Sequence, residues 1–105
     1  MKDRHPDDTY YSDTRGKNLF GYRVDDDSME PQFRRGDIAV VNPNLSARPG
    51  DYVVALVLGE TAPKALLRRM GSTGLLETLA KGHSPVAAGA YEVLGRVVER
   101  KRLYR

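Results

Sequence analysis

The order of apolar and polar residues along the chain is typical of short strands. Residues 52–58, YVVALVL, are apolar at both alternating positions, as expected for a strand buried on both faces. Residues 37–43, DIAVVNP, form a shorter apolar run that a proline ends. Turn-forming residues occupy ARPGD before the first of these runs and GETAPK after it. The pattern predicts two strands separated by tight turns.

Further strands are predicted on either side. Residues 18–24 are β-prone, and 65–70 could pair with 52–58 as a hairpin, while 74–80 could be a strand or a short helix. Residues 91–103 look like one long strand that places Tyr91, Val93 and Val97 on one face, with Gly95 between them. No stretch keeps a helical period over three turns. We therefore expect a mostly β domain of five or six strands, folded as a compact, coiled, antiparallel sheet.

One short helical turn is predicted just after Ser28. Pro31 suits the first turn of a helix and Gly36 suits its C-terminal cap. Asp27 and Glu30 have the spacing of a capping box, in which each side chain bonds the other residue's backbone amide. Part of the acidic run before Ser28 is therefore explained as a helix start.

The composition indicates one domain and excludes several classes of site. The 105 residues suit a single globular unit over 18–105, preceded by a polar linker or arm over 1–17. There is no cysteine, and His5 and His83 are too far apart to suggest zinc, so we expect neither a metal nor a cofactor. The longest apolar run is far shorter than the roughly 20 residues of a membrane span, and no signal peptide is evident. We expect a cytoplasmic protein with no membrane contact.

The positive charge is concentrated at the C-terminus. The chain carries +3, whereas its last ten residues carry +4, from five cations and Glu99. A basic tail is compatible with binding to nucleic-acid phosphates. It is also compatible with an edge strand whose charges prevent aggregation, and no aromatic stacking pattern of a nucleic-acid site accompanies it. The edge-strand interpretation is preferred here.

Ser28 has two interpretations from the residues alone. A serine before a helix usually caps it, by accepting a hydrogen bond from the backbone. The same position would suit a nucleophile, because unpaired amides at a helix start can stabilise an oxyanion. A nucleophilic serine also needs a base, and the pattern of residues does not identify one.

A longer set of motifs resembles a known family. VDDDSMEP (24–31) is followed by Gly36-Asp37, a strand, Gly50-Asp51, another strand and the late VLGRVVER (93–100). This ordered set resembles the C-terminal domain of LexA-type and lambda-type phage repressors, and the resemblance covers residues from about 18 to 100. It implies a fold of the LexA and signal-peptidase type, with a Ser–Lys dyad that cuts the protein's own linker. It also implies that Ser28 is the nucleophile, with the amides of Ser28 and Met29 facing the oxyanion.

The chain departs from the family pattern at the lysine. The family has its lysine in a strand resembling LLRRM, so Arg68 occupies that position. A buried lysine can lose its proton and act as a base, whereas arginine stays protonated. Arg68 should therefore donate hydrogen bonds to Ser28 or to a neighbouring carboxylate. Lys64 is a substitute base, but it lies four residues earlier, roughly 13 Å along a strand.

The segment that the family cuts is not evident either. Only 27 residues precede Ser28, and the early pair Arg15-Gly16 has an arginine where the family has a small residue before the glycine. We therefore expect the oligomerisation domain of a LexA-like or phage-type repressor whose cleavage site is degenerate. Its implied partners are a second copy, DNA bound through an N-terminal domain absent from this chain, and a RecA-like co-protease or an antirepressor. Two alternatives stay open: an active self-cleaving protease or its mature fragment, and a UmuD-like accessory subunit of a lesion-bypass polymerase.

Overall fold

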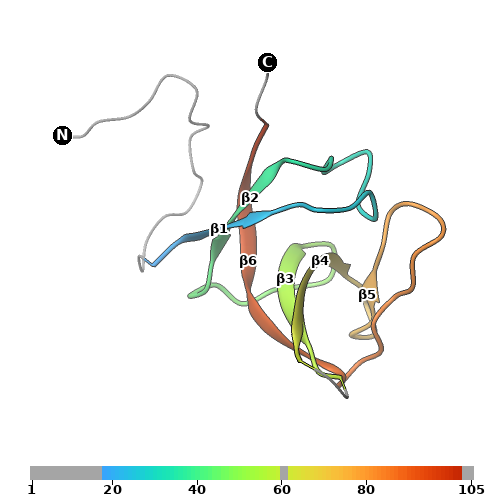
Figure 1. The fold of residues 1–105 in the computed structure, drawn as a ribbon. Helices are drawn as coiled ribbons and strands as arrows, with labels where there is room; N and C mark the ends of the chain where they lie inside the picture. The colour runs from blue at the N-terminus through green and yellow to red at the C-terminus, as the bar shows by residue number, and fades with distance from the viewer. Residues whose placement is uncertain (1–17, 60–61, 103–105) are drawn as a thin grey trace.

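The computed structural model describes residues 18–59 and 62–102, which form one curled antiparallel sheet (Figure 1). Its order is β1-β2-β6-β3-β4-β5, and every neighbouring pair is antiparallel. The mostly β prediction is confirmed, and the predicted arm over 1–17 lies outside the described residues. The six strands are β1 (Phe20–Arg23), β2 (Ile38–Asn42), β3 (Tyr52–Val57), β4 (Lys64–Met70), β5 (Leu76–Glu77) and β6 (Tyr91–Lys101).

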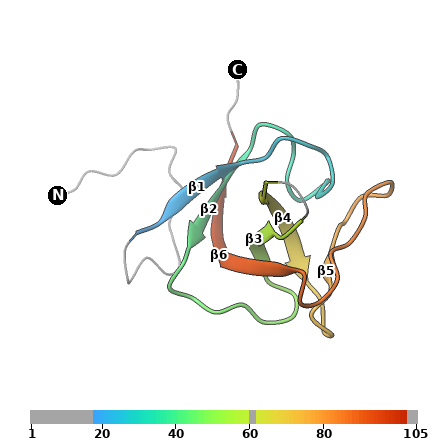
Figure 2. The same ribbon diagram turned by 60° about the horizontal axis from the view of Figure 1, so that its bottom comes forward.

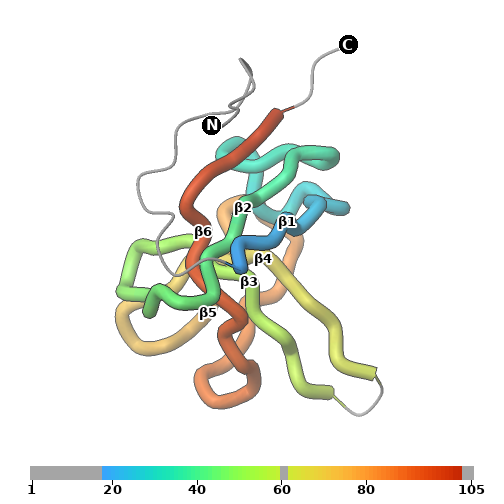
Figure 3. Tube along the Cα trace, turned by 90° about the vertical axis from the view of Figure 1, so that its left-hand side faces the viewer, coloured from blue at the N-terminus to red at the C-terminus, as the bar shows by residue number. Residues whose placement is uncertain are grey.

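Strand β6 is the centre of the sheet. Its C-terminal half pairs with β2 and its N-terminal half pairs with β3, so one strand joins the two halves of the molecule. The register shifts once in each pairing, leaving Val98 and Leu94 without a partner in the ladder. Such bulges bend a strand and increase its twist. The sheet accordingly curls into a half-barrel, with β6 running along its whole length (Figures 2 and 3).

The bulge at Leu94 changes which face of β6 points into which core. Tyr91 and Val93, before the bulge, pack against one buried cluster, whereas Leu94 and Val97 pack against another. The prediction that Tyr91, Val93 and Val97 share one face is therefore wrong. The extra residue interrupts the two-residue alternation on which that prediction rested.

Two apolar clusters stabilise the sheet from opposite sides, and β3 contributes to both. Val54 belongs to the first cluster, while Val53 and Ala55 belong to the second, and all three are fully buried. The predicted strand buried on both faces is confirmed for β3, whereas Leu58 lies beyond its end and is 53% exposed. The first cluster also contains Val24, Met29, Phe33, Ala39, Val41 and Leu67, and the second also contains Leu76 and Val86.

The predicted helical turn after Ser28 is not confirmed. Residues 26–33 form consecutive turns and bends, and no helix occurs in the part of the chain that the structure describes. A single i to i+4 hydrogen bond is present, from the Phe33 amide to the Met29 carbonyl at 3.0 Å. The segment GLLETLA, for which strand and helix were both considered, supplies the two-residue strand β5. No helix among the described residues is long and apolar enough to span a membrane.

The basic end of β6 pairs with β2 alone among the described strands, because β3 pairs only with residues 91–96 of β6. Its cations also make intramolecular contacts. Arg102 binds the buried carboxylate of Asp37, with nitrogen–oxygen distances of 2.8 and 3.0 Å, and Arg100 donates to the Gln32 carbonyl at 2.9 Å. The preferred interpretation of the tail as a charged edge is compatible with this one-sided pairing and stays a prediction. These arginines connect the sheet to the turn that follows Ser28.

Replacing Gly95 with alanine should destabilise the fold. An added Cβ would lie 2.6 Å from Val41 Cγ1 and 2.9 Å from both the Asn42 oxygen and Pro43 Cα. Because two of these atoms are backbone, relief requires β6 and β2 to separate, which we expect to cost about 1–3 kcal/mol of unfolding free energy. Urea unfolding followed by circular dichroism would measure the loss. Gly59→Ala is the control, since nothing lies within 4 Å of its added Cβ. Equal stability of the two variants would contradict the close approach.

Candidate functional site

The turn that carries Ser28 is fixed at both ends by backbone hydrogen bonds. The Val24 amide donates to the Asp37 carbonyl, and the Gly36 amide donates to the Val24 carbonyl, each at 2.8 Å. Between these points Met29 and Phe33 insert into the first apolar cluster. The turn therefore cannot move without disturbing the core, and Ser28, which precedes one of these anchors, has a defined position.

Asp26 holds both polar groups of Ser28. Its Oδ1 accepts the Ser28 amide at 3.0 Å and the Ser28 hydroxyl at 2.7 Å. An aspartate that bonds the amide two residues on is a common way to stabilise a turn. The predicted capping box of Asp27 and Glu30 is therefore wrong. The Asp27 carboxylate instead pairs with His83 Nε2 at 2.8 Å, and Glu30 contributes only its amide, which donates to the Asp27 carbonyl.

Arg68 approaches the same hydroxyl from β4. Its Nη1 donates to Ser28 Oγ at 2.9 Å and to the Leu67 carbonyl at 2.8 Å. The Ser28 and Arg68 residues are only 2% and 5% exposed. The structure thus brings together the two positions that the family resemblance paired, and Arg68 acts as a hydrogen-bond donor, as its chemistry predicts. The Ser28 hydroxyl donates to Asp26 and accepts from Arg68.

Burial and neighbouring charge act on the pKa of each group at the site. Burial lowers the pKa of Arg68, and the Asp26 charge opposes this. Burial raises the pKa of Asp26, but its two hydrogen bonds from Ser28 and the nearby Arg68 charge outweigh burial and leave that pKa below its ordinary value. Burial together with Asp25 and Asp26 raises the pKa of Tyr22 to about 12. At neutral pH the hydroxyl therefore lies between a carboxylate and a guanidinium.

The other predicted site residues are placed less favourably for catalysis. Lys64 lies at the exposed start of β4, opposite Val57 and near the far end of the hairpin, whereas Arg68 lies opposite Val53. The Ser28 amide, expected at the oxyanion position, already donates to Asp26. Met29 is buried in the core at 1% exposure. The arrangement provides Ser28 with a cation and an acceptor, and it places no neutral amine beside the hydroxyl.

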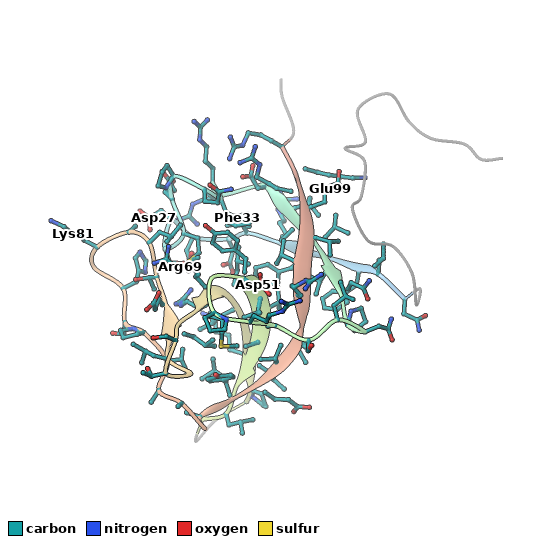
Figure 4. All side chains as sticks on the ribbon, turned by 180° about the vertical axis from the view of Figure 1, so that it is seen from behind. Asp27, Phe33, Asp51, Arg69, Lys81 and Glu99 are labelled. Atoms are coloured by element: carbon teal, nitrogen blue, oxygen red, sulfur yellow. The ribbon has the colours of Figure 1, made fainter. Side chains whose placement is uncertain are left out.

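Backbone and side-chain hydrogen bonds from two further segments lie around Ser28. The Leu79 and Ala80 amides, in the loop after β5, both donate to the Ser28 carbonyl at 3.0 Å. Figure 4 shows Asp27 and Lys81, which mark the turn and this loop, on the same side of the molecule. Across the site, the Tyr22 hydroxyl donates to the Ala65 carbonyl of β4 at 3.3 Å. On β4, strand β5 pairs only with Arg69 and Met70, while the Ala65 and Leu67 carbonyls accept from the side chains of Tyr22 and Arg68.

Sequence reasoning did not identify Asp26, Tyr22, Leu79 or Ala80. The acidic run before Ser28 contained a signal for Asp26, because a carboxylate two residues before an amide often caps it. The contacts of Tyr22 and of the loop after β5 join residues 43 and more than 50 positions apart in the chain. They depend on the curl of the sheet, for which the local pattern holds no signal.

The site is thus a buried serine on a fixed turn that faces a cationic residue of a curled β-sheet. The sequence matches the Peptidase S24-like family over residues 3–98, and the chain belongs to this family. It is similar to the LexA repressor of Syntrophobacter fumaroxidans, with 41% identity over 91 residues. It is also similar to the LexA repressor of Clostridium botulinum strain Hall, with 35% identity over 89 residues. Each alignment covers 84% of this chain and 44% of the relative, so the chain spans less than half the length of these relatives.

Replacing Ser28 with alanine should destabilise the domain. The change removes the hydrogen bond that Arg68 Nη1 donates to the Ser28 hydroxyl. It also removes the bond that this hydroxyl donates to Asp26 Oδ1. We expect a loss of about 1–3 kcal/mol of unfolding free energy, measured by urea denaturation. Ser84→Ala, at an exposed serine, should change it by less than about 0.5 kcal/mol. A stability gain for Ser28→Ala would contradict a structural role, because gains on substitution are typical of residues kept for activity.

Proposed function

We propose that this chain is the C-terminal, oligomerisation domain of a LexA-like repressor and that its Ser–Lys cleavage site is degenerate. The similarity to two LexA repressors and membership of the Peptidase S24-like family support the repressor assignment. The hydrogen bond from Arg68 to the Ser28 hydroxyl carries the second part of the proposal. A guanidinium at this place supplies charge without supplying a base.

The chemistry of a serine nucleophile explains why this contact matters. Attack requires that the hydroxyl transfer its proton to a neighbouring group as the new bond forms. Arg68 stays protonated and already donates to the oxygen, so it occupies a lone pair and cannot receive the proton. Asp26 accepts the hydroxyl proton in a hydrogen bond, but its lowered pKa makes it a weak base. Ser28 is therefore held in place without being activated.

The partners follow from the repressor assignment. A second copy of the chain would bring two DNA-binding domains to paired half-sites, and DNA would be bound through a domain that is not in this sequence. A RecA-like co-protease or an antirepressor would act on the assembly. With its cleavage site degenerate, relief of repression would proceed by release from DNA or by loss of the oligomer.

The full-length parent should remain intact during prolonged alkaline incubation. Alkaline pH promotes cleavage where a buried lysine serves as the base, because it removes the ammonium proton. Arg68 provides no such group, so the expected rate is several orders of magnitude below that of a site with its base. Gel electrophoresis and intact-mass spectrometry over about a day at pH 10 would measure it.

The matched control for this incubation is the Ser28→Ala parent. Identical traces for the two proteins are expected. Fragments from the unmodified parent alone, at one defined bond, would show a working base and would overturn the degenerate assignment. Repeating the incubation with Lys64→Ala would then test whether the exposed lysine of β4 supplies that base.

The 105-residue chain should associate as a dimer or a larger oligomer. Recognition of paired half-sites requires two copies, and the proposed role of this domain is to supply the contact between them. Sedimentation velocity at about 5 and 50 µM would measure association, and the average sedimentation coefficient should increase with concentration. Monomer alone at both concentrations would count against the oligomerisation role and leave the family assignment unaffected.

A further inference from the structure

A second residue, besides Arg68, acts on the Ser28 hydroxyl. Asp26 Oδ1 lies 2.7 Å from Ser28 Oγ, and Arg68 Nη1 lies 2.9 Å from the same oxygen. The hydroxyl therefore bridges a carboxylate and a cation that are each one hydrogen bond away. Whatever side chain occupies position 68 must share this small space with the Asp26 charge.

We propose that Asp26 is a second determinant of the inactive site, which orients the hydroxyl proton of Ser28 away from β4 and keeps any amine at position 68 in its charged form. This inference rests on the proposed function and concerns the same serine. It follows from the distances, because an ammonium within about 4–6 Å of a carboxylate is stabilised relative to the neutral amine. Arg68→Lys alone would then place a charged lysine, and so an ineffective base, beside Ser28.

Burial alone would have the opposite effect on a lysine at this position. Arg68 is 5% exposed, and removal of an ammonium from water favours the neutral amine. Asp26 opposes this, and the proposal requires its effect to be the larger. The other ionisable groups that act at the site are Tyr22 on β1, Asp25, whose charge acts on Tyr22, and His83 in the loop after β5. None of the three is a partner in the two hydrogen bonds to Ser28 Oγ.

The test compares the pKa of the introduced lysine in Arg68→Lys and in Asp26→Asn/Arg68→Lys, in the 105-residue chain. Chains labelled with ¹³C at lysine Cε would be titrated by NMR, and the new signal is the one missing from the unmodified chain. Loss of the carboxylate should lower this pKa by at least one unit, which is a tenfold increase in the neutral fraction. Equal values in the two variants would overturn the proposal.

The matched control is Asp25→Asn/Arg68→Lys, which removes the same charge one residue away. Asp25 is exposed and makes no side-chain bond to Ser28 among those described, so the lysine pKa should change by no more than a few tenths. A drop as large as that for Asp26→Asn would show a general charge effect and reject the specific role.

A measurement on the unmodified chain keeps the test valid if the lysine variants do not fold. The Asp26 carboxyl ¹³C signal, titrated between pH 2 and 7, should give a pKa below the ordinary value of about 3.9 for aspartate. An ordinary or raised value would contradict the proposal. These results are independent of the incubation and sedimentation of the unmodified proteins, so either proposal can fail while the other stands.

Discussion

The pairing of β6 with both β2 and β3 is the constraint on which the rest of the molecule depends. Without this strand, the hairpin of β3 and β4 and the pair of β1 and β2 would share no ladder. The Ser28 turn follows β1, and Arg68 lies on β4, so the two halves of the site come from the two halves of the sheet. The 2.9 Å hydrogen bond between Arg68 and Ser28 therefore depends on the alignment of the two halves by β6.

The Ser28 site combines a fixed turn with a serine held between two charged side chains. The turn is fixed, the serine is buried and a strand residue reaches it, as a nucleophile requires. The hydroxyl donates its proton to Asp26, and one of its two oxygen lone pairs accepts a hydrogen bond from Arg68. In such a network the serine contributes to stability through its hydrogen bonds to two charged side chains.

The sequence was informative where the chemistry is local and misleading where it depends on the curl. The buried β3 strand followed from apolar residues at both alternating positions, and the donor role of Arg68 followed from its fixed charge. The helix after Ser28 was predicted from Pro31 and Gly36, but Asp26 already satisfies the Ser28 amide and the segment closes as turns. The charges of the basic tail gave no signal that Arg100 and Arg102 bind the turn after Ser28 and the carboxylate of Asp37. Contacts between residues so far apart in the chain do not appear in the local pattern of apolar and polar residues.

Because of the bulge at Leu94, substitutions at Val93 and at Val97 in this family should correlate with different neighbouring residues. Val93 packs with Leu76 and Val86 in one cluster, while Val97, four residues on, packs with Val41 and Val54 in the other. Volume changes at Val93 would thus be compensated near β5, and those at Val97 near β2. Related sequences aligned across β6 without allowing for a one-residue shift would mix these two sets of neighbours. Covariation calculated from such an alignment would then link residues of separate cores.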